Sequence, residues 1–398
     1  MKLGNIDIES ITANDVVALR DNDVRESTNL EYKLNFPEET RKTDFAVDVA
    51  AMANCGGGFI LYGIEEKREG QQKTGAIESF PGVGTTALDS LISKYANIAR
   101  AHVKPVISDL TFKPIKLSPD LYVVAVHVPK TYDGPHFSTS NMVFYSRHSS
   151  GNYRMELSEI RSAFIARSTA REEAMNWTVK QLAWITEGKA PIPLRVANTV
   201  PSVLHIVPWY AFSGADLLDV DQMYEQRTNF QPMTTTRGVS KFNAKGLLLL
   251  DRADAAVAGY TQVFRTGQLG SVDVYSIPSD APTIHCFDFE NNIREHIKAY
   301  LGGLRALGII PPITIVLNII NATGLKILMP EHHIRYHQDE PSLNYNSDSF
   351  ITAVSRRLDG WDSLDVDYLI KPMFDTLWIA CGWRSSPNFT DGVWTPSK

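Results

Sequence analysis

The chain has 398 residues, enough for two or three domains, and its 43% hydrophobic and 21% charged residues are ordinary for a globular protein without large disordered regions. A formal net charge of -6 argues against a surface coated in basic side chains that binds DNA of any sequence, although a local basic groove is compatible with it. Three widely separated cysteines without a CxxC pair exclude a disulfide framework and a cysteine zinc site.

The sequence shows neither the pattern of a signal peptide nor that of a membrane-spanning helix. The first residues lack the apolar core of a signal peptide. The longest apolar runs, such as residues 246–250, have the length of a strand and not of a membrane-spanning helix. We therefore expect a soluble, cytoplasmic protein with no membrane span.

Helices and strands alternate in the first part of the chain. A helix is predicted over residues 11–20, with Thr12 as its cap and Asp15 in its first turn. A strand begins near Leu30, and a helix over residues 40–54 follows it. Glycines at residues 56–58 end this helix, and an apolar strand follows at 59–64. A turn is predicted at 70–75 and a helix at 86–99. Strands at 121–128 and 143–147 then precede a closing helix at 156–165.

The second part of the chain also mixes the two kinds of element. A charged helical connector at residues 170–187 leads to strands at 203–207, 247–250, 272–277 and 313–319 and to helices at 291–304 and 372–379. Pro372 suits the first position of the last helix. The overall expectation is an α+β protein, with a mixed-sheet domain over residues 1–168 and a second α/β or α+β domain over residues 169–398.

A possible acidic site lies in the first part of the chain. Glu31 and Lys33 are two residues apart on a predicted strand, so both side chains lie on one face. The pair Glu65-Glu66 follows the apolar strand, and Glu26 precedes the first strand. If these carboxylates converge, a proton or a hard cation must offset their repulsion, as in sites that cleave phosphodiesters. The alternative is a surface ion pair beside a solvated turn.

A set of spaced motifs resembles a known family. The motifs are E-S-x-x-x-E-Y-K at residues 26–33, A-M-A-N at 51–54, G-G at 57–58, Y-G-I-E-E at 62–66 and Gly75. Together with Phe144, Arg147 and the helix that follows them, they resemble the Schlafen-type AlbA domain over roughly residues 11–166. No single motif would suffice for this resemblance.

The resemblance implies an endoribonuclease that cuts tRNA or rRNA, in phage defence or the stress response. Glu26, Glu31 and Glu66 would be the catalytic and metal-binding acids for Mg²⁺ or Mn²⁺, with Lys33 on the scissile phosphate. The third acid is usually an aspartate in this family, so glutamate is a departure here, and either Glu65 or Glu66 matches its position. Such proteins clamp RNA between two copies of the domain. This chain carries one copy, so a homodimer is expected, with residues 169–398 as a sensor or regulator.

Other candidates carry weaker signals. The basic residues Arg41, Lys42, Arg147 and Arg154 are candidates for tracking an RNA backbone, although scattered charges are more often solvated. His136 and His148 are candidates either for facing RNA or for internal hydrogen bonds. A cluster formed by His332, His333 and His337 has the residue types of a zinc site.

Two further expectations concern other functional classes. The glycines at residues 56–58 and 82–84 lack the lysine of a phosphate-binding loop, so no ATP hydrolysis is expected. A non-catalytic nucleic-acid-binding or transcription-regulator-like module remains the alternative function, although residues 170–398 contain no convincing helix-turn-helix. A third interpretation makes the first domain a dimer scaffold, with the function in the second.

Overall fold

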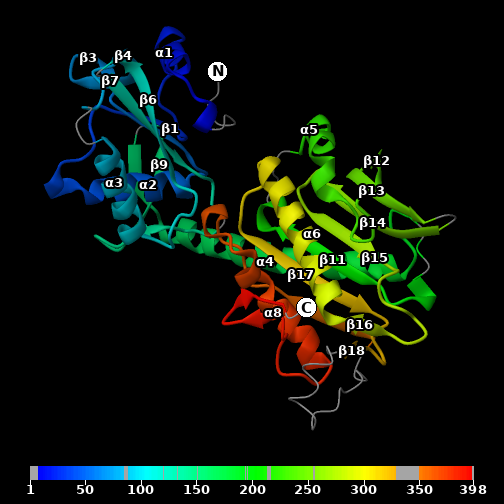
Figure 1. The fold of residues 1–398 in the computed structure, drawn as a ribbon. Coiled ribbons are helices and arrows are strands. Elements are labelled where there is room, and N and C mark those ends of the chain that lie inside the picture. Colours follow the sequence, from blue (N-terminus) through cyan, green and yellow to red (C-terminus); the bar gives the residue numbers. More distant parts are fainter. Residues whose placement is uncertain are drawn as a thin grey trace. The chain divides into compact units, whose positions relative to one another are not determined.

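The computed structural model describes residues 8–84, 88–119, 121–131, 133–149, 151–192, 194, 196–212, 217–253, 256–328 and 349–396. The chain divides into two compact units, Met1–Ser168 and Thr169–Lys398 (Figure 1). Both units combine helices with sheets, which confirms the predicted α+β class. No helix in the described part of the chain is long and apolar enough to cross a membrane.

The main sheet of the first unit has the strand order β1-β2-β7-β6. Its strands are β1 Leu30–Lys33, β2 Gly58–Tyr62, β7 Leu121–Val128 and β6 Thr111–Ser118. The pair β1–β2 is parallel and the other two pairs are antiparallel. The central strands β2 and β7 are buried on both faces, as their apolar sequences predict. Strand β6 was not predicted, because its lysines and Pro114 belong to an exposed edge strand.

Helices cover the sheet on both faces. On one face α2 (Thr43–Asn54) and α3 (Leu88–His102) pack their apolar stripes on β2 and β7. On the other face α1 (Ala13–Asp21) packs through Val16 and Leu19. The predicted start of α1 is confirmed, since Thr12 and Asp15 form a reciprocal capping box.

Strand alternation decides which side chains of β1 meet which helix. Leu30 and Tyr32 belong to the core on the α1 face. Glu31 and Lys33 therefore lie on the opposite face, where α2 covers the sheet. The parallel pairing of β1 with β2 requires a crossover, and α2 is that crossover.

The glycines after α2 form the tight turn that the sequence predicts. Gly56, Gly57 and Gly58 have positive φ angles of 101°, 81° and 152°. A Cβ atom on Gly57 would lie 2.5 Å from the backbone nitrogen of Lys130, and one on Gly58 would overlap the carbonyl of Asn29. Glycine is thus required by the close approach of neighbouring backbones.

A hairpin replaces the turn predicted at residues 70–75. Strands β3 (Glu65–Glu69) and β4 (Gln72–Ser79) pair in antiparallel fashion around Gly70, whose φ is 65°. The prediction was too short because the charged run from Glu65 to Glu69 has no apolar alternation. A second small sheet has the order β10-β9-β8-β5, made of Gly151–Arg154, Val143–His148, Phe137–Ser138 and Val103–Lys104.

One long helix, α4 (Leu157–Thr186), takes the place of two predicted ones. The prediction separated a closing helix at 156–165 from a connector at 170–187. That separation was wrong, because no proline or glycine interrupts the sequence between them. The later part of α4 is also more than a connector, since Ala170, Ala174 and Ile185 are buried in cores of the second unit.

The second unit is built on a seven-stranded antiparallel sheet of order β12-β13-β14-β15-β11-β17-β19. The strands are Val239–Asn243, Gly246–Ala253, Ala256–Phe264, Leu269–Asp273, Ser202–Pro208, Ile313–Ile320 and Phe350–Val354. Tyr260 and Val272 face α4, whereas Thr261 and Ser271 hydrogen-bond Tyr300 of α6 (Cys286–Ala306). Helices therefore cover both faces of this sheet.

Smaller elements complete the second unit. Helix α8 spans Val366–Ala380 and begins at the cap Asp365, so the prediction that Pro372 opens the helix was wrong, and Pro372 lies inside it. The others are α5 Val220–Glu225, β16 Thr283–His285, β18 Lys326–Leu328, β20 Phe389–Thr390 and β21 Val393–Trp394. Short 3₁₀ helices lie at Ile8–Ser10, Glu39–Arg41, Val196–Asn198, Trp209–Phe212, Gln226–Phe230 and Trp361–Ser363.

Asn54 joins three segments of the first unit. Its amide nitrogen donates to the carbonyls of His136 and Tyr145, each at 2.7 Å, and its oxygen accepts from the backbone N–H of His136 at 2.7 Å. The last residue of α2 thus fixes both β9 and the loop before β8. This contact explains why the A-M-A-N motif ends in an amide.

We expect Asn54→Ala to lower the free energy of unfolding of the first unit by about 2–4 kcal/mol, because backbone groups that are partly buried lose their partners. Urea unfolding followed by circular dichroism measures this loss. All seven tryptophans lie in the second unit, so their fluorescence transition should stay in place. Asn22→Ala, which removes one exposed hydrogen bond to Ala18, is the matched control and should cost below about 1 kcal/mol.

Candidate functional site

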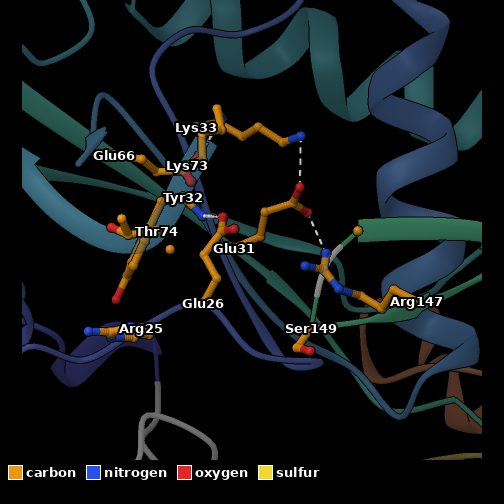
Figure 2. A pocket seen from close by; sticks show the side chains of 12 residues that line it. Arg25, Glu26, Glu31, Tyr32, Lys33, Glu66, Lys73, Thr74, Arg147 and Ser149 are labelled. Carbon is orange, nitrogen blue, oxygen red and sulfur yellow. Dashed lines mark hydrogen bonds and ion pairs between the residues drawn. The ribbon is translucent and has the colours of Figure 1, made fainter. Parts of the chain in front are cut away.

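A pocket of about 530 Å³ opens in the first unit (Figure 2). Its lining comes from the segment before β1, from β1 itself, from the β3–β4 hairpin and from the β9–β10 region. Four of the lining residues are basic and three are acidic, so the pocket is a concentrated set of charges. The lining residues are Arg25, Glu26, Glu31, Tyr32, Lys33, Glu66, Lys73, Thr74, Gly75, Arg147, Ser149 and Gly151.

Glu31 is bound by a cation on each of its two oxygens. Lys33 Nζ lies 2.7 Å from Oε1, and the buried Arg147 guanidinium donates to Oε2 (Figure 2). Burial opposes the charged form of Glu31, but Lys33 and Arg147 outweigh burial and lower its pKa. Glu31 is therefore a fixed anion that holds two cations in place.

Lys33 lies between two carboxylates. Besides Glu31 it faces Asp48 of α2, with Nζ 3.5 Å from Oδ2. Burial alone would lower the pKa of Lys33, but Asp48 and Glu31 raise it above the ordinary value. Burial and then repulsion from Glu31 raise the pKa of Asp48 to about 6, and Asn152 donates to its other oxygen at 2.6 Å. Lys33 thus keeps its charge at any physiological pH.

Glu26 lines the pocket and has a pKa raised into the neutral range. Its Oε1 accepts the backbone N–H of Tyr32 at 2.7 Å. Burial raises the pKa of Glu26 to about 7, the Tyr32 bond opposes this rise, and the charges of Glu66 and Glu31 add to it. The pocket therefore holds a carboxyl group that is poised between its two protonation states.

The sequence left Glu65 and Glu66 as alternatives for the third acid of the site, and the structure places Glu66 in the pocket and Glu65 on the exposed surface. Because neighbouring residues of a strand point to opposite faces, only one of them enters the pocket. Glu66 lines the pocket and is buried, with Oε1 paired to Lys73 and Oε2 buried without a hydrogen-bond partner among the described residues. Glu65 is exposed and accepts from Ser79 Oγ at 2.8 Å.

Gly75, the last of the motif residues, connects the β3–β4 hairpin to the segment before β1. Its carbonyl accepts the backbone N–H of Glu26 at 2.8 Å, which ties the hairpin to the segment before β1. Gly75 has a φ of 73°, and a Cβ atom there would lie 3.5 Å from Cβ of Glu26. The hairpin and Glu26 therefore keep a fixed spacing.

The predicted RNA-tracking residues lie in different places. Arg147 is buried in the pocket and bound to Glu31. Arg41 pairs with Asp44 at 2.9 Å and Lys42 with Glu39 at 2.6 Å, and neither lines the pocket. Arg154 is exposed on β10, also outside the lining. The structure thus brings one of these four basic residues together with the acids.

The two histidines that were candidates for facing RNA differ in burial. His136 is buried, with Nδ1 at 2.8 Å from the carbonyl of Pro105 and Nε2 at 2.6 Å from Thr131 Oγ1. Burial lowers its pKa to about 4, so it is a neutral residue within the structure. His148 is exposed and stacks on Tyr153. The cluster at residues 332, 333 and 337 lies outside the described residues.

The acids of the pocket offer oxygen ligands to a divalent metal ion. Carboxylate oxygens are the ligands of Mg²⁺ and Mn²⁺, and Oε2 of Glu66 is buried without a hydrogen-bond partner among the described residues, which leaves it available as a ligand atom. Within the described residues, however, no three His, Cys, Asp or Glu side chains form a group that holds a metal. Mg²⁺ is often bound by one or two carboxylates together with water and a substrate phosphate. Glu26 and Glu66 fit that smaller ligand set.

Comparison with known proteins gives the family of the first unit. Residues 26–156 match the family model described as Schlafen, AlbA_2, which confirms the resemblance and indicates a nucleic-acid-related function. One similar solved structure is the solution NMR structure of the N-terminal domain of a putative ATP-dependent DNA helicase RecG-related protein from Nitrosomonas europaea. It is 16% identical, with 35% of this chain and 87% of that chain covered and a TM-score of 0.27. No curated protein matches the chain.

The pH dependence of stability follows from Glu26. Its pKa is higher in the folded protein, so the folded state binds the proton more tightly and stability falls as pH rises from 4.5 through about 7. That difference corresponds to about 3 kcal/mol at most. We expect Glu26→Gln, which cannot ionise, to remove the part of the pH dependence that Glu26 contributes.

Urea unfolding of the first unit at pH 5 and pH 8, followed by circular dichroism, measures the effect. The variant should exceed the wild type in stability at pH 8 and approach it at pH 5. A stability difference between variant and wild type that does not grow from pH 5 to pH 8 would contradict the raised pKa of Glu26, because Asp48 and His136 also contribute to the wild-type profile.

Proposed function

Because residues 26–156 make the first unit a Schlafen-type AlbA_2 domain, we propose that this pocket is the active site of a divalent-metal-dependent endoribonuclease that cleaves structured RNA, tRNA above all. One observation supports the proposal most strongly. Glu26, Glu31 and Glu66 come from separate segments of the chain and line one pocket together with four basic side chains. Phage defence or the stress response is the proposed setting, on the resemblance alone.

Glu26 and Glu66 would hold Mg²⁺ or Mn²⁺. When bound, the ion supplies charge neutralisation at the scissile phosphate and a more acidic water. Glu26 releases its proton easily because its pKa is about 7, so it becomes an anionic ligand near neutral pH. The prediction that Glu31 is also a ligand stays a prediction. Direct ligation would require Lys33 or Arg147 to release one of its oxygens.

Lys33 is the group proposed to contact the phosphate. Glu31 and Asp48 hold its ammonium from two sides, and one third of its side chain is exposed to the pocket. A lysine held in this way is already oriented when the substrate arrives, which favours stabilisation of charge that develops during cleavage. Arg147, fixed on the other oxygen of Glu31, adds a second positive charge on the same side.

The pair Glu65 and Glu66 offers a sharp test. We expect wild-type protein with Mn²⁺ to cleave tRNA and Glu66→Gln to lose about 100-fold or more of the rate, because a ligand of the ion is removed. Glu65→Gln changes the same charge one residue away on the exposed face and should cleave like the wild type.

Denaturing gels of labelled tRNA, with and without EDTA, measure both rates. Equal loss in the two variants would contradict the assignment of Glu66. Cleavage that persists in EDTA would contradict the metal.

The alternative is a domain that binds nucleic acid without cutting it. Two observations favour this alternative. Basic residues outnumber acidic residues in the lining of the pocket. Each lining carboxylate except Glu26 is also paired with a lysine or an arginine. In that case the wild type would bind RNA in a salt-dependent manner and leave it intact under every metal condition.

The proposal extends to the assembly of the protein. The chain carries one domain of this family, so two copies would be needed to clamp an RNA from both sides. The second unit would then regulate the nuclease. We expect a homodimer by light scattering at micromolar concentration, and a monomer that cleaves tRNA at full rate would contradict the clamp.

A further inference from the structure

Lys73 differs from Lys33 and Arg147 of the pocket in the exposure of its side chain. Its side chain on β4 is 56% exposed, whereas the side chain of its partner Glu66 is 5% exposed. A buried carboxylate has few alternative positions, but a lysine on the surface of a hairpin has many rotamers. In the Lys73–Glu66 pair, Glu66 is therefore the fixed member and Lys73 the mobile one.

Lys33 and Arg147 are held more firmly than Lys73. Arg147 is buried and bound to Glu31, and Lys33 is held between Glu31 and Asp48. Lys73 has one carboxylate partner within ion-pair distance among the described residues. Moving Lys73 out of the pocket thus breaks one ion pair, and a cation that binds Glu66 in its place would again neutralise the buried carboxylate.

The ammonium of Lys73 binds a carboxylate oxygen that the proposed metal ion would also use. It binds Oε1 of Glu66, and the other oxygen of Glu66 is buried without a described partner. Lys73 is therefore the counter-ion of Glu66, which is one of the two proposed ligands.

We propose that Lys73 is an exchangeable internal counter-ion that competes with the divalent cation for Glu66. In the empty pocket it neutralises Glu66, and the cation must displace it in order to bind. The inference rests on the proposed function, since it takes Glu66 as a ligand of the ion. Its consequence is that the free protein binds metal more weakly than its carboxylates alone would.

Calorimetric titration of the full chain with Mn²⁺ alone tests this competition, without RNA and without activity. We expect Lys73→Met to bind Mn²⁺ about fivefold more tightly than the wild type, because the competing ion pair is gone. Lys73→Arg keeps the charge and should bind no more tightly than the wild type.

Lys67→Met is the matched control for net charge. Lys67 is exposed on the same hairpin, next to Glu66, and does not line the pocket. Removing its charge should change the Mn²⁺ affinity less than twofold, because its charge is screened by solvent. If Lys67→Met and Lys73→Met bind equally tightly, the effect is that of net charge and the inference is overturned.

Glu66→Gln separates failure of this inference from failure of the proposed function. If the wild type binds Mn²⁺, Glu66→Gln does not, and Lys73→Met binds like the wild type, only the competition by Lys73 is overturned. If neither the wild type nor Lys73→Met binds Mn²⁺, both the competition and the metal site are overturned. If Lys73→Met alone binds measurably, the inference is supported in its strongest form.

Discussion

The burial of Glu31 between Lys33 and Arg147 is the interaction on which the pocket depends. A carboxylate at this depth is stable as an anion only because two cations contact its oxygens. Those cations belong to β1 and β9, so satisfying one buried charge brings distant parts of the chain together. The arrangement continues through Lys33 to Asp48 of α2 and through Asp48 to Asn152 of β10. The charges of the pocket thus form a connected network.

The backbone of the first unit supports that network. The alternation of β1 puts Tyr32 into the core behind the sheet, while Glu31 and Lys33 face α2. The glycine turn after α2 allows β2 to lie parallel to β1 at close range. Asn54 at the end of α2 holds the segments around His136 and Tyr145, and β9, which contains Tyr145, carries Arg147. The uncharged motif residues, which are the glycines and Asn54, therefore position the charged residues of the pocket.

Periodicity in the sequence predicted the parts of the site that depend on local structure. The two-residue spacing of Glu31 and Lys33 predicted a shared face, and their contact confirms it. The choice between Glu65 and Glu66 required the hairpin, whose charged first strand has no apolar pattern. Asp48 and Lys73 were missed because one looks like a helix residue and the other like a surface lysine. Asp48 contacts residues far along the chain, Lys33 and Asn152, whereas Lys73 contacts Glu66 across a hairpin that the sequence did not predict.

The lining of the pocket runs from Arg25 to Gly151, so nearly the whole of the first unit must be in place before the pocket exists. Contacts of such long sequence separation form late in folding. A nascent chain still on the ribosome lacks β9 until most of the unit has been synthesised, and without Arg147 the Glu31 carboxylate loses one of its two cations. The pocket is therefore incomplete until β9 and β10 have been synthesised and have folded onto the rest of the unit.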